Sequence, residues 1–310
     1  MELKREKVTF PSAASGVTVT GYLYLPDGSP RAIVQLAHGM LDHVGRYEEM
    51  IEALTAAGFA VVGNDHIGHG ATAADREALG FFGRRGARQD IVSDLHRMSE
   101  IAKERLGDLP LLLVGHSMGS FLVRLYAEKW GQELSALVLL GTAGKNPAVP
   151  FGKLLADLIR LFRGKRHRSR ILTAITFMGY QSHYKEEHSH LSWLTRDPEY
   201  RKACAEDPLC HFLFTVSAYR ELYAMLGEVN RRAWFRSIPP SLPVLLAAGE
   251  EDPVGAYGRG VRQVERSLRR AGVSDLRLLL YPGARHELHH ETNRAEFFSD
   301  LVSYLSEVVE

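Results

Sequence analysis

The feature that most restricts the fold of this chain is a regular alternation of short apolar runs with segments of helical spacing. The runs have the length of strands, and most are followed by a segment whose apolar residues recur every three or four positions. The expected strands cover residues 32–37, 59–62, 111–114, 136–140, 243–248 and 276–281. The expected helices cover residues 46–57, 89–106, 120–130, 261–271 and 295–309. This alternation predicts a mostly parallel sheet with helices on both faces.

Two parts of the chain depart from this alternation. Residues 7–25 carry alternating apolar and polar side chains and end at a turn sequence, Pro26-Asp27-Gly28, which predicts two antiparallel strands and brings the sheet to eight. After Gly144, residues 146–240 contain helical patterns and loops but no convincing strand. We therefore expect a core of residues 1–145 and 241–310, with a helical insertion of residues 146–240 after the sixth strand. Ligands bind at the carboxyl ends of parallel strands, so this insertion is a candidate cap or lid.

The bulk composition excludes several classes of protein. The 310 residues carry a formal net charge of +1, which gives no general reason to expect a nucleic-acid partner. The longest apolar runs are far too short to span a bilayer, and the charged start, residues 1–7, lacks the apolar centre of a signal peptide. Only Cys204 and Cys210 are present, so no disulfide framework is expected. A cytoplasmic location is the simplest interpretation.

The pattern Gly115-His116-Ser117-Met118-Gly119 carries the strongest chemical signal. It lies between an expected strand and an expected helix. A serine on such a sharp turn adopts strained backbone angles, which only small neighbours permit, and its hydroxyl points out of the sheet. This context favours Ser117 as a nucleophile over a purely structural turn.

A serine hydroxyl needs a neighbouring base, and the base needs an acid to orient it. Asp252 follows the strand at 243–248, and His286 follows the strand at 276–281, so both lie where they could meet Ser117. The order Ser, Asp, His is typical of α/β hydrolases. Asp252 is preferred to two preceding glutamates because a proline and a glycine form a turn after it. His286 is preferred to two later histidines because Pro282-Gly283 places it on a loop.

The reaction of an ester also needs donors for the developing oxyanion. The backbone N–H of Met118, directly after the nucleophile, is one expected donor. The second is expected in the loop after the strand at 32–37, where Gly39 allows a turn toward Ser117 and leaves the N–H of Met40 available.

Two histidine patterns could suggest a metal. Residues 286–290 match the zinc-protease signature H-E-x-x-H, but the motif starts directly after a strand and a turn, whereas the zinc site needs both histidines on an established helix. His183, His188 and His190 are expected to lie on a solvated loop. We therefore expect no metal and no cofactor.

Together, the motifs resemble those of the monoacylglycerol lipase and lysophospholipase group of α/β hydrolases, which are serine hydrolases of the S33 type. The resemblance implies an eight-stranded α/β-hydrolase fold, a triad of Ser117, Asp252 and His286, oxyanion donors at Met40 and Met118, and no cofactor. It also implies a structural role for residues 65–70, and we expect Arg46 to pair with a carboxylate. The motifs that carry the resemblance are His38-Gly39-Met40, Gly45-Arg46-Tyr47, Asp65-His66-Ile67-Gly68-His69-Gly70, Gly115-His116-Ser117-Met118-Gly119, Gly249-Glu250-Glu251-Asp252-Pro253 and Tyr281-Pro282-Gly283-Ala284-Arg285-His286-Glu287.

The insertion matches this group least, and it leaves alternatives open. Residues 151–162 have an apolar face at helical spacing, and residues 163–170 are strongly basic. This pair could contact an anionic membrane surface, or it could be a lid helix packed on its own domain with a solvated tail. Four apolar residues are predicted to line an acyl pocket, with ordinary packing between cap and core as the alternative: Phe177, Met178, Phe212 and Phe214.

The expected activity is hydrolysis of medium or long acyl esters, of the monoacylglycerol or lysophospholipid type. An aminopeptidase or amidase with the same triad is the enzyme alternative. It would need a carboxylate in the cap for a free amine, and Glu186, Glu187 and Glu206 are available. A non-catalytic ligand-binding protein with the same fold is the other alternative.

Overall fold

The computed structural model describes residues 4–310, so the first three residues of the charged N-terminal segment lie outside the described part. All strands join one sheet in the order β1-β2-β4-β3-β5-β6-β7-β8. Their bounds are β1 (Lys4–Pro11), β2 (Thr18–Leu25), β3 (Ala32–Ala37), β4 (Phe59–Asn64), β5 (Leu111–His116), β6 (Ala136–Leu140), β7 (Val244–Gly249) and β8 (Leu276–Tyr281). The β1–β2 and β2–β4 pairs are antiparallel and the other five are parallel, so the predicted sheet is confirmed.

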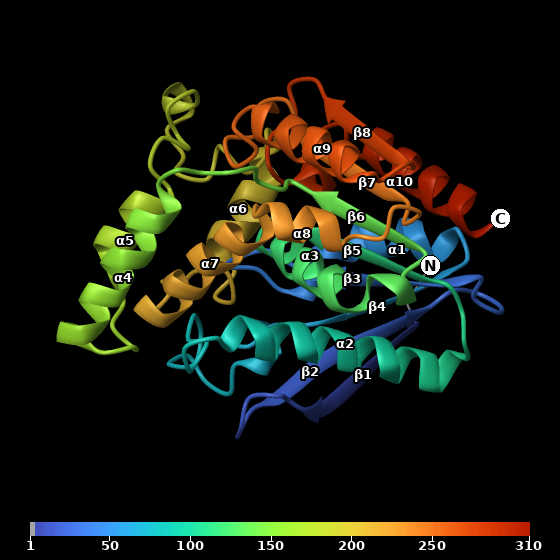
Figure 1. Cartoon of the computed structure of the whole chain (residues 1–310), viewed down its shortest axis with the longest axis horizontal. Coiled ribbons are helices and arrows are strands. Elements are labelled where there is room, and N and C mark those ends of the chain that lie inside the picture. Colours follow the sequence, from blue (N-terminus) through green and yellow to red (C-terminus); the bar gives the residue numbers. More distant parts are fainter. Residues whose placement is uncertain (1–3) are drawn as a thin grey trace.

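Helices cover both faces of the sheet (Figure 1). They are α1 (Glu48–Ala56), α2 (Ala87–Leu106), α3 (Met118–Trp130), α4 (Val149–Arg163), α5 (Arg170–Thr176), α6 (Pro198–Glu206), α7 (Val216–Val229), α8 (Arg232–Ser237), α9 (Arg259–Ala271) and α10 (Arg294–Val309). Alternate residues of β5 enter different cores: Leu111 and Leu113 pack with α2, α3 and α9, whereas Leu112 and Val114 pack with α1 and α10. Because both faces are covered, the central strands β3, β4 and β5 are buried along their whole length and mostly apolar.

Strand β5 and helix α3 both extend further than the sequence predicts. The strand continues to His116 and the helix starts at Met118, so Ser117 alone separates them. The extension follows from the neighbouring strands, because Gly115 pairs with both Ala37 of β3 and Leu139 of β6. Pairing on both sides keeps the strand extended into a glycine that local propensity disfavours.

The segment between β6 and β7 contains helices α4 to α8 and no strand. Helix α4 packs against α7, and α7 packs against α3 of the core. Apolar residues of this segment, such as Ala156, Tyr219 and Trp234, belong to the same buried cluster as α2 and α3. Figure 1 shows α4 and α5, in green, at the opposite end of the molecule from the C-terminus.

Candidate active site

Ser117 occupies a strained turn between β5 and α3. Its backbone angles are φ 54° and ψ −119°, a region that residues with a side chain rarely adopt. The neighbouring chain holds it there, because the Ser117 N–H donates to the Leu140 carbonyl at 2.9 Å and the Ser120 hydroxyl donates to the Ser117 carbonyl at 2.6 Å. The turn places the nucleophile candidate at the N-terminus of α3, where backbone N–H groups are unpaired.

Three glycines allow the close packing around Ser117. A Cβ atom on Gly119 would lie 2.1 Å from the Ala37 carbonyl oxygen, and one on Gly115 would lie 2.5 Å from the Gly119 carbonyl oxygen. A Cβ atom on Gly39 would lie 3.3 Å from the Ser117 Cβ. The start of α3 therefore rests directly on β3, and the loop after β3 reaches the serine.

The structure brings Asp252 and His286 together. Nδ1 of His286 donates to Oδ2 of Asp252 at 3.0 Å, and both side chains are buried. The other carboxylate oxygen accepts the N–H of Val254 at 2.8 Å, which fixes the orientation of the acid. Glu250 and Glu251, the two rival acids, are exposed.

The environment of His286 favours its protonated form. Burial lowers the pKa of this imidazole, but the charge and hydrogen bond of Asp252 outweigh burial and raise the pKa above its ordinary value. The ring lies beside the residue that precedes the nucleophile, with 4.8 Å between the ring centres of His286 and His116. Within residues 4–310, no hydrogen bond joins the Ser117 hydroxyl to the His286 ring; such bonds are often long without substrate.

A buried carboxylate shapes the loop that carries Met40. The Asp42 side chain accepts the N–H of Gly39 at 3.2 Å and the N–H of His43 at 2.9 Å. Burial opposes its charge, but the Arg46 guanidinium holds the pKa of Asp42 well below the ordinary value. The loop is thus held against the first turn of α3, where Met118 is buried. That the N–H groups of Met40 and Met118 are the oxyanion donors stays a prediction.

Arg46 joins the loops that carry Met40 and His286. Its guanidinium donates two hydrogen bonds of 2.8 Å to Glu287, directly after His286, and one of 3.1 Å to Asp42. The expected carboxylate partner of Arg46 is therefore present. No local pattern identifies Glu287 as this partner, because it lies 241 positions further along the chain. The Tyr47 hydroxyl adds a further link, since it donates to Asp42 at 2.6 Å.

The cap segment contacts the His286 loop directly. The N–H of Glu287 donates to the Leu194 carbonyl at 2.7 Å, and the Trp193 ring centre lies 5.2 Å from that of His286. Arg285 donates to the Ser192 carbonyl at 2.6 Å and pairs with the Glu187 carboxylate at 3.0 Å. Sequence analysis did not identify this pair, because no local pattern marks it.

The segment of residues 65–70 has a structural arrangement, as expected from the resemblance. The N–H of His66 donates to the His38 ring at 3.0 Å, and the two rings stack at 3.9 Å. Burial lowers the pKa of His38 and of His69 to about 3, so both rings are neutral near pH 7. The Asp65 carboxylate accepts backbone N–H groups at 2.9 and 2.7 Å, which fixes the loop after β4.

The four predicted pocket residues occupy different environments. Phe214 has no exposed surface and packs 5.1 Å from the Phe82 ring, so ordinary core packing, not a pocket wall, describes it. Met178 is 75% exposed at the surface of the cap. Phe212 and Phe177 are half-buried, and Phe177 lies 5.8 Å from Trp193, the ring that faces His286. Of the four, Phe177 is thus connected most directly to the candidate site.

The H-E-x-x-H pattern does not form a zinc-protease site. His286 precedes a single short turn and contacts Asp252, and Glu287 pairs with Arg46. In the part of the chain that the structure describes, two groups of three side chains could hold a metal ion, and neither contains His286. These groups are Glu287, His289 and His290, and His43, Asp207 and Cys210.

Comparison with known proteins identifies the family of this chain. The family model described as serine aminopeptidase, S33, matches residues 28–293. The chain belongs to this family. It is 27% identical to the monoacylglycerol lipase of Mycolicibacterium smegmatis over 300 residues, which cover 95% of each protein. It is also 27% identical to the monoglyceride lipase of Mus musculus over 271 residues, 86% of this chain and 78% of the mouse protein.

Solved structures agree with this assignment. A thermostable carboxyl esterase from Bacillus coagulans, crystallised with glycerol, has a TM-score of 0.91 and 31% identity over 99% of both chains. A soluble variant of the monoglyceride lipase from Saccharomyces cerevisiae is 20% identical and shares the fold, with a TM-score of 0.78. The predicted α/β-hydrolase fold and the resemblance to the monoacylglycerol lipase group are therefore confirmed, and the chain is a hydrolase.

Proposed function

We propose that this protein is a serine hydrolase that cleaves carboxylic esters of monoacylglycerols or lysophospholipids through an acyl-enzyme intermediate. The observation that carries the proposal is the strained Ser117 turn beside the buried His286–Asp252 pair, with a glycine loop packed against the serine. Relatives named monoacylglycerol lipase or monoglyceride lipase, aligned over most of this chain, support the substrate class.

The roles of the side chains follow from their geometry. Asp252 holds Nδ1 of His286, so Nε2 is left to take the proton as the Ser117 hydroxyl attacks the ester carbonyl. The Asp252 charge stabilises the imidazolium that forms, in agreement with the raised pKa of His286. The N–H groups of Met40 and Met118 stabilise the oxyanion. His286 then protonates the leaving alcohol, and a water activated by the same ring releases the acid.

Ester specificity is favoured over aminopeptidase specificity by the state of the cap carboxylates. An aminopeptidase needs a carboxylate that is available to bind the substrate amine. Glu187 pairs with both Arg285 and Arg201, and Glu186 and Glu206 are exposed. None of the three is a free acid held inside the site.

The test compares wild type with Ser117→Ala on monoacylglycerols, lysophospholipids and aminoacyl arylamides, and measures labelling by a fluorophosphonate. Wild type is expected to turn over the esters and to be labelled, and Ser117→Ala to lose both. Retained ester turnover in the variant would contradict the mechanism. Preference for arylamides would favour the aminopeptidase, and an unlabelled wild type would favour a non-catalytic protein.

The cap supplies a second part of the proposal, a contact with an anionic lipid surface that positions it as a lid. Helix α4 packs on cap helix α7 through its small residues, since Gly152 and Ala156 are buried and a Cβ atom on Gly152 would lie 2.8 Å from the Tyr223 ring. Its outer face exposes large apolar side chains, among them Leu161 and Phe162, and the basic residues 163–170 follow. An apolar face beside basic residues binds the boundary of an anionic bilayer. Every helix within residues 4–310 is too short or too polar to cross a membrane.

Co-sedimentation with vesicles tests this contact. Wild type is expected to bind vesicles of anionic phospholipid at low ionic strength and to dissociate as salt rises. Leu161→Asp combined with Phe162→Asp is expected to abolish binding, and zwitterionic vesicles serve as the control. Failure of wild type to bind at low ionic strength would leave α4 as an internally packed lid helix.

A further inference from the structure

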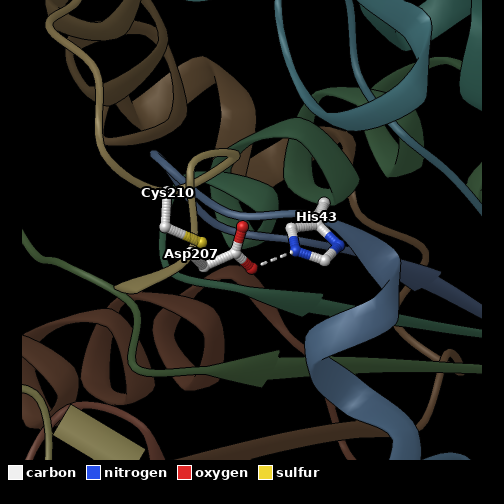
Figure 2. A group of neighbouring side chains, drawn as sticks. All are labelled: His43, Asp207 and Cys210. Carbon is white, nitrogen blue, oxygen red and sulfur yellow. Dashed lines mark hydrogen bonds and ion pairs between the residues drawn. The ribbon is translucent and has the colours of Figure 1, made fainter. Parts of the chain in front are cut away.

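Three side chains of metal-binding types, none of them a member of the triad, converge where the loop after β3 meets the cap. The His43 ring, an Asp207 carboxylate oxygen and the Cys210 sulfur each offer a ligand atom, and these atoms all lie within 4.8 Å of one another. Figure 2 shows the three side chains directed toward one another, with His43 Nε2 and Asp207 Oδ2 separated by 2.8 Å.

The local chain prearranges two of the ligands. Asp207 directly follows α6, and the N–H of Cys210 donates to the Asp207 carbonyl at 3.0 Å, which folds residues 207–210 into a tight turn. The N–H of Leu209 donates to Asp207 Oδ1 at 2.8 Å and leaves the other oxygen directed at His43. Hydrogen bonds that orient a ligand in this way are typical of metal sites. The chain's other thiol, Cys204, lies in α6, six positions before Cys210.

The ligand set and its spacing suit Zn²⁺. Imidazole nitrogen, carboxylate oxygen and thiolate sulfur bind Zn²⁺ at about 2.0–2.3 Å, so tetrahedral ligands stand roughly 3.3–3.8 Å apart. Small side-chain rotations therefore suffice to place an ion between the three atoms.

An acidic cavity leads to the group. Asp207 lines an open cavity of about 300 Å³ together with Glu48 and Glu52, and with Glu49, whose charge Arg294 neutralises. Arg46 also lines this cavity, but Asp42 and Glu287 neutralise its charge. Carboxylates at the entrance raise the local concentration of divalent cations.

We propose that His43, Asp207 and Cys210 form a binding site for a thiophilic divalent cation, Zn²⁺ being the best match, with Cys204 or a water as fourth ligand. Binding replaces the His43–Asp207 hydrogen bond with two bonds to the ion. The neutral His43 ring exchanges its Nε2 proton for one on Nδ1, so that Nε2 can bind the ion, and the Cys210 thiol releases its proton to solvent. The ion joins the loop of residues 39–47 to the cap. The assignment of this site does not rest on the proposed ester hydrolysis.

The experiment uses the full chain, stripped with a chelator and kept under a phosphine reductant so that both thiols stay free. Zn²⁺ affinity is measured by competition with a chromophoric chelator, and Co²⁺ reports sulfur ligation through its thiolate charge-transfer absorption. Wild type is expected to bind one Zn²⁺ and to unfold at a higher temperature when it is bound. His43→Gln and Cys210→Ser are expected to bind at least about tenfold more weakly, and Cys210→Ser to lose the Co²⁺–thiolate band.

His211→Gln is the matched control, because His211 is adjacent to Cys210 in sequence but exposed and outside the group. It is expected to bind Zn²⁺ as wild type does. Circular dichroism of each metal-free variant shows that it is folded. Equal Zn²⁺ affinity in wild type, His43→Gln and Cys210→Ser, or no binding by wild type, would overturn the proposal.

Discussion

The central strands bury their apolar side chains, whereas helix α4 of the cap leaves most of its large apolar side chains exposed. Every residue of β3, β4 and β5 is buried, because helices cover both faces of the sheet. Helix α4 buries only Val149, Gly152 and Ala156, while Phe162 at its end is 80% exposed. The core therefore tolerates almost no change in the shape of its residues, whereas the outer face of α4 is not constrained by the protein itself. We expect mutations in the core to change the rate of ester hydrolysis, and mutations on the outer face of α4 to change only the binding of lipid surfaces.

The largest effect is expected from Asp252→Asn in the core. The amide keeps the shape of the acid but favours the wrong tautomer of His286 and does not stabilise the imidazolium, so kcat should fall about 10⁴-fold. Steady-state hydrolysis of a p-nitrophenyl ester measures this, with thermal unfolding as the check on folding. A fall of less than tenfold would show that the acid is elsewhere.

The pH profile is expected to follow His286. The imidazole must be neutral to act as base, and Asp252 raises its pKa above the ordinary value of 6.5. Activity should therefore decline as pH falls through a value above 6.5, by about tenfold per unit on the acidic side. The pH dependence of kcat/KM measures the midpoint. A midpoint below 6.5 would contradict the dominance of Asp252 over burial.

Glycine-to-alanine exchanges compare the two regions in stability. Gly119→Ala places a Cβ atom 2.1 Å from the Ala37 carbonyl, so α3 must move and the free energy of unfolding should fall by about 3 kcal/mol. Gly227→Ala in cap helix α7 meets nothing closer than 3.4 Å and is expected to be neutral or to stabilise by up to about 1 kcal/mol. Urea unfolding followed by circular dichroism measures both. Equal losses of unfolding free energy in the two variants would show that Gly119 is packed no more tightly than Gly227.

A smaller effect is expected where the cap meets the core. Glu187→Gln weakens the pair with Arg285, the residue before His286. Because the pair is partly exposed, the free energy of unfolding should fall by about 1 kcal/mol or less, and kcat by less than about tenfold through looser positioning of the base. The neighbouring, exposed Glu186→Gln is the control and should match wild type. Equal behaviour of both variants would exclude a role for this contact.

The smallest effect on chemistry is expected from the outer face of α4. Phe162→Asp replaces a side chain that is 80% exposed, so the free energy of unfolding should change by no more than about 0.5 kcal/mol. Turnover of a water-soluble short-chain ester should match wild type. A large loss with this substrate would mean that Phe162 packs on the site during turnover, which would break the separation between the two regions.

Local patterns predicted most of the elements and failed mainly at their ends. The strands at 32–37, 136–140 and 276–281 have the predicted bounds, because each is a short, mostly apolar run. Burial on both faces explains this for the first two, whereas the edge strand β8 is only partly buried. The extension of β5 to His116 was missed, because it depends on pairing with β3 and β6. Tertiary contacts override the weak strand propensity of Gly115.

In the candidate site, too, local features could be predicted from the sequence and long-range contacts could not. The Ser117 turn, Asp252 and His286 could be proposed from sequence, because each lies in a short motif at the end of a strand, and parallel strands present these ends at one edge. The residues that pair with partners far along the chain could not be identified from the sequence. Arg46 meets Glu287 across 241 positions, and Arg285 meets Glu187 across 98. No local periodicity encodes such a pairing.

The sequence by itself determined the order of strands and helices, the serine at a tight turn and the family. These features depend on residues close together in the chain, through apolar periodicity and the small size of glycine. Only the tertiary structure decided that Asp42 holds the loop of Met40, that cap residues contact the His286 loop, and that His43 meets Asp207 and Cys210. These contacts form between segments far apart in sequence, so they exist only once the sheet and the cap have packed.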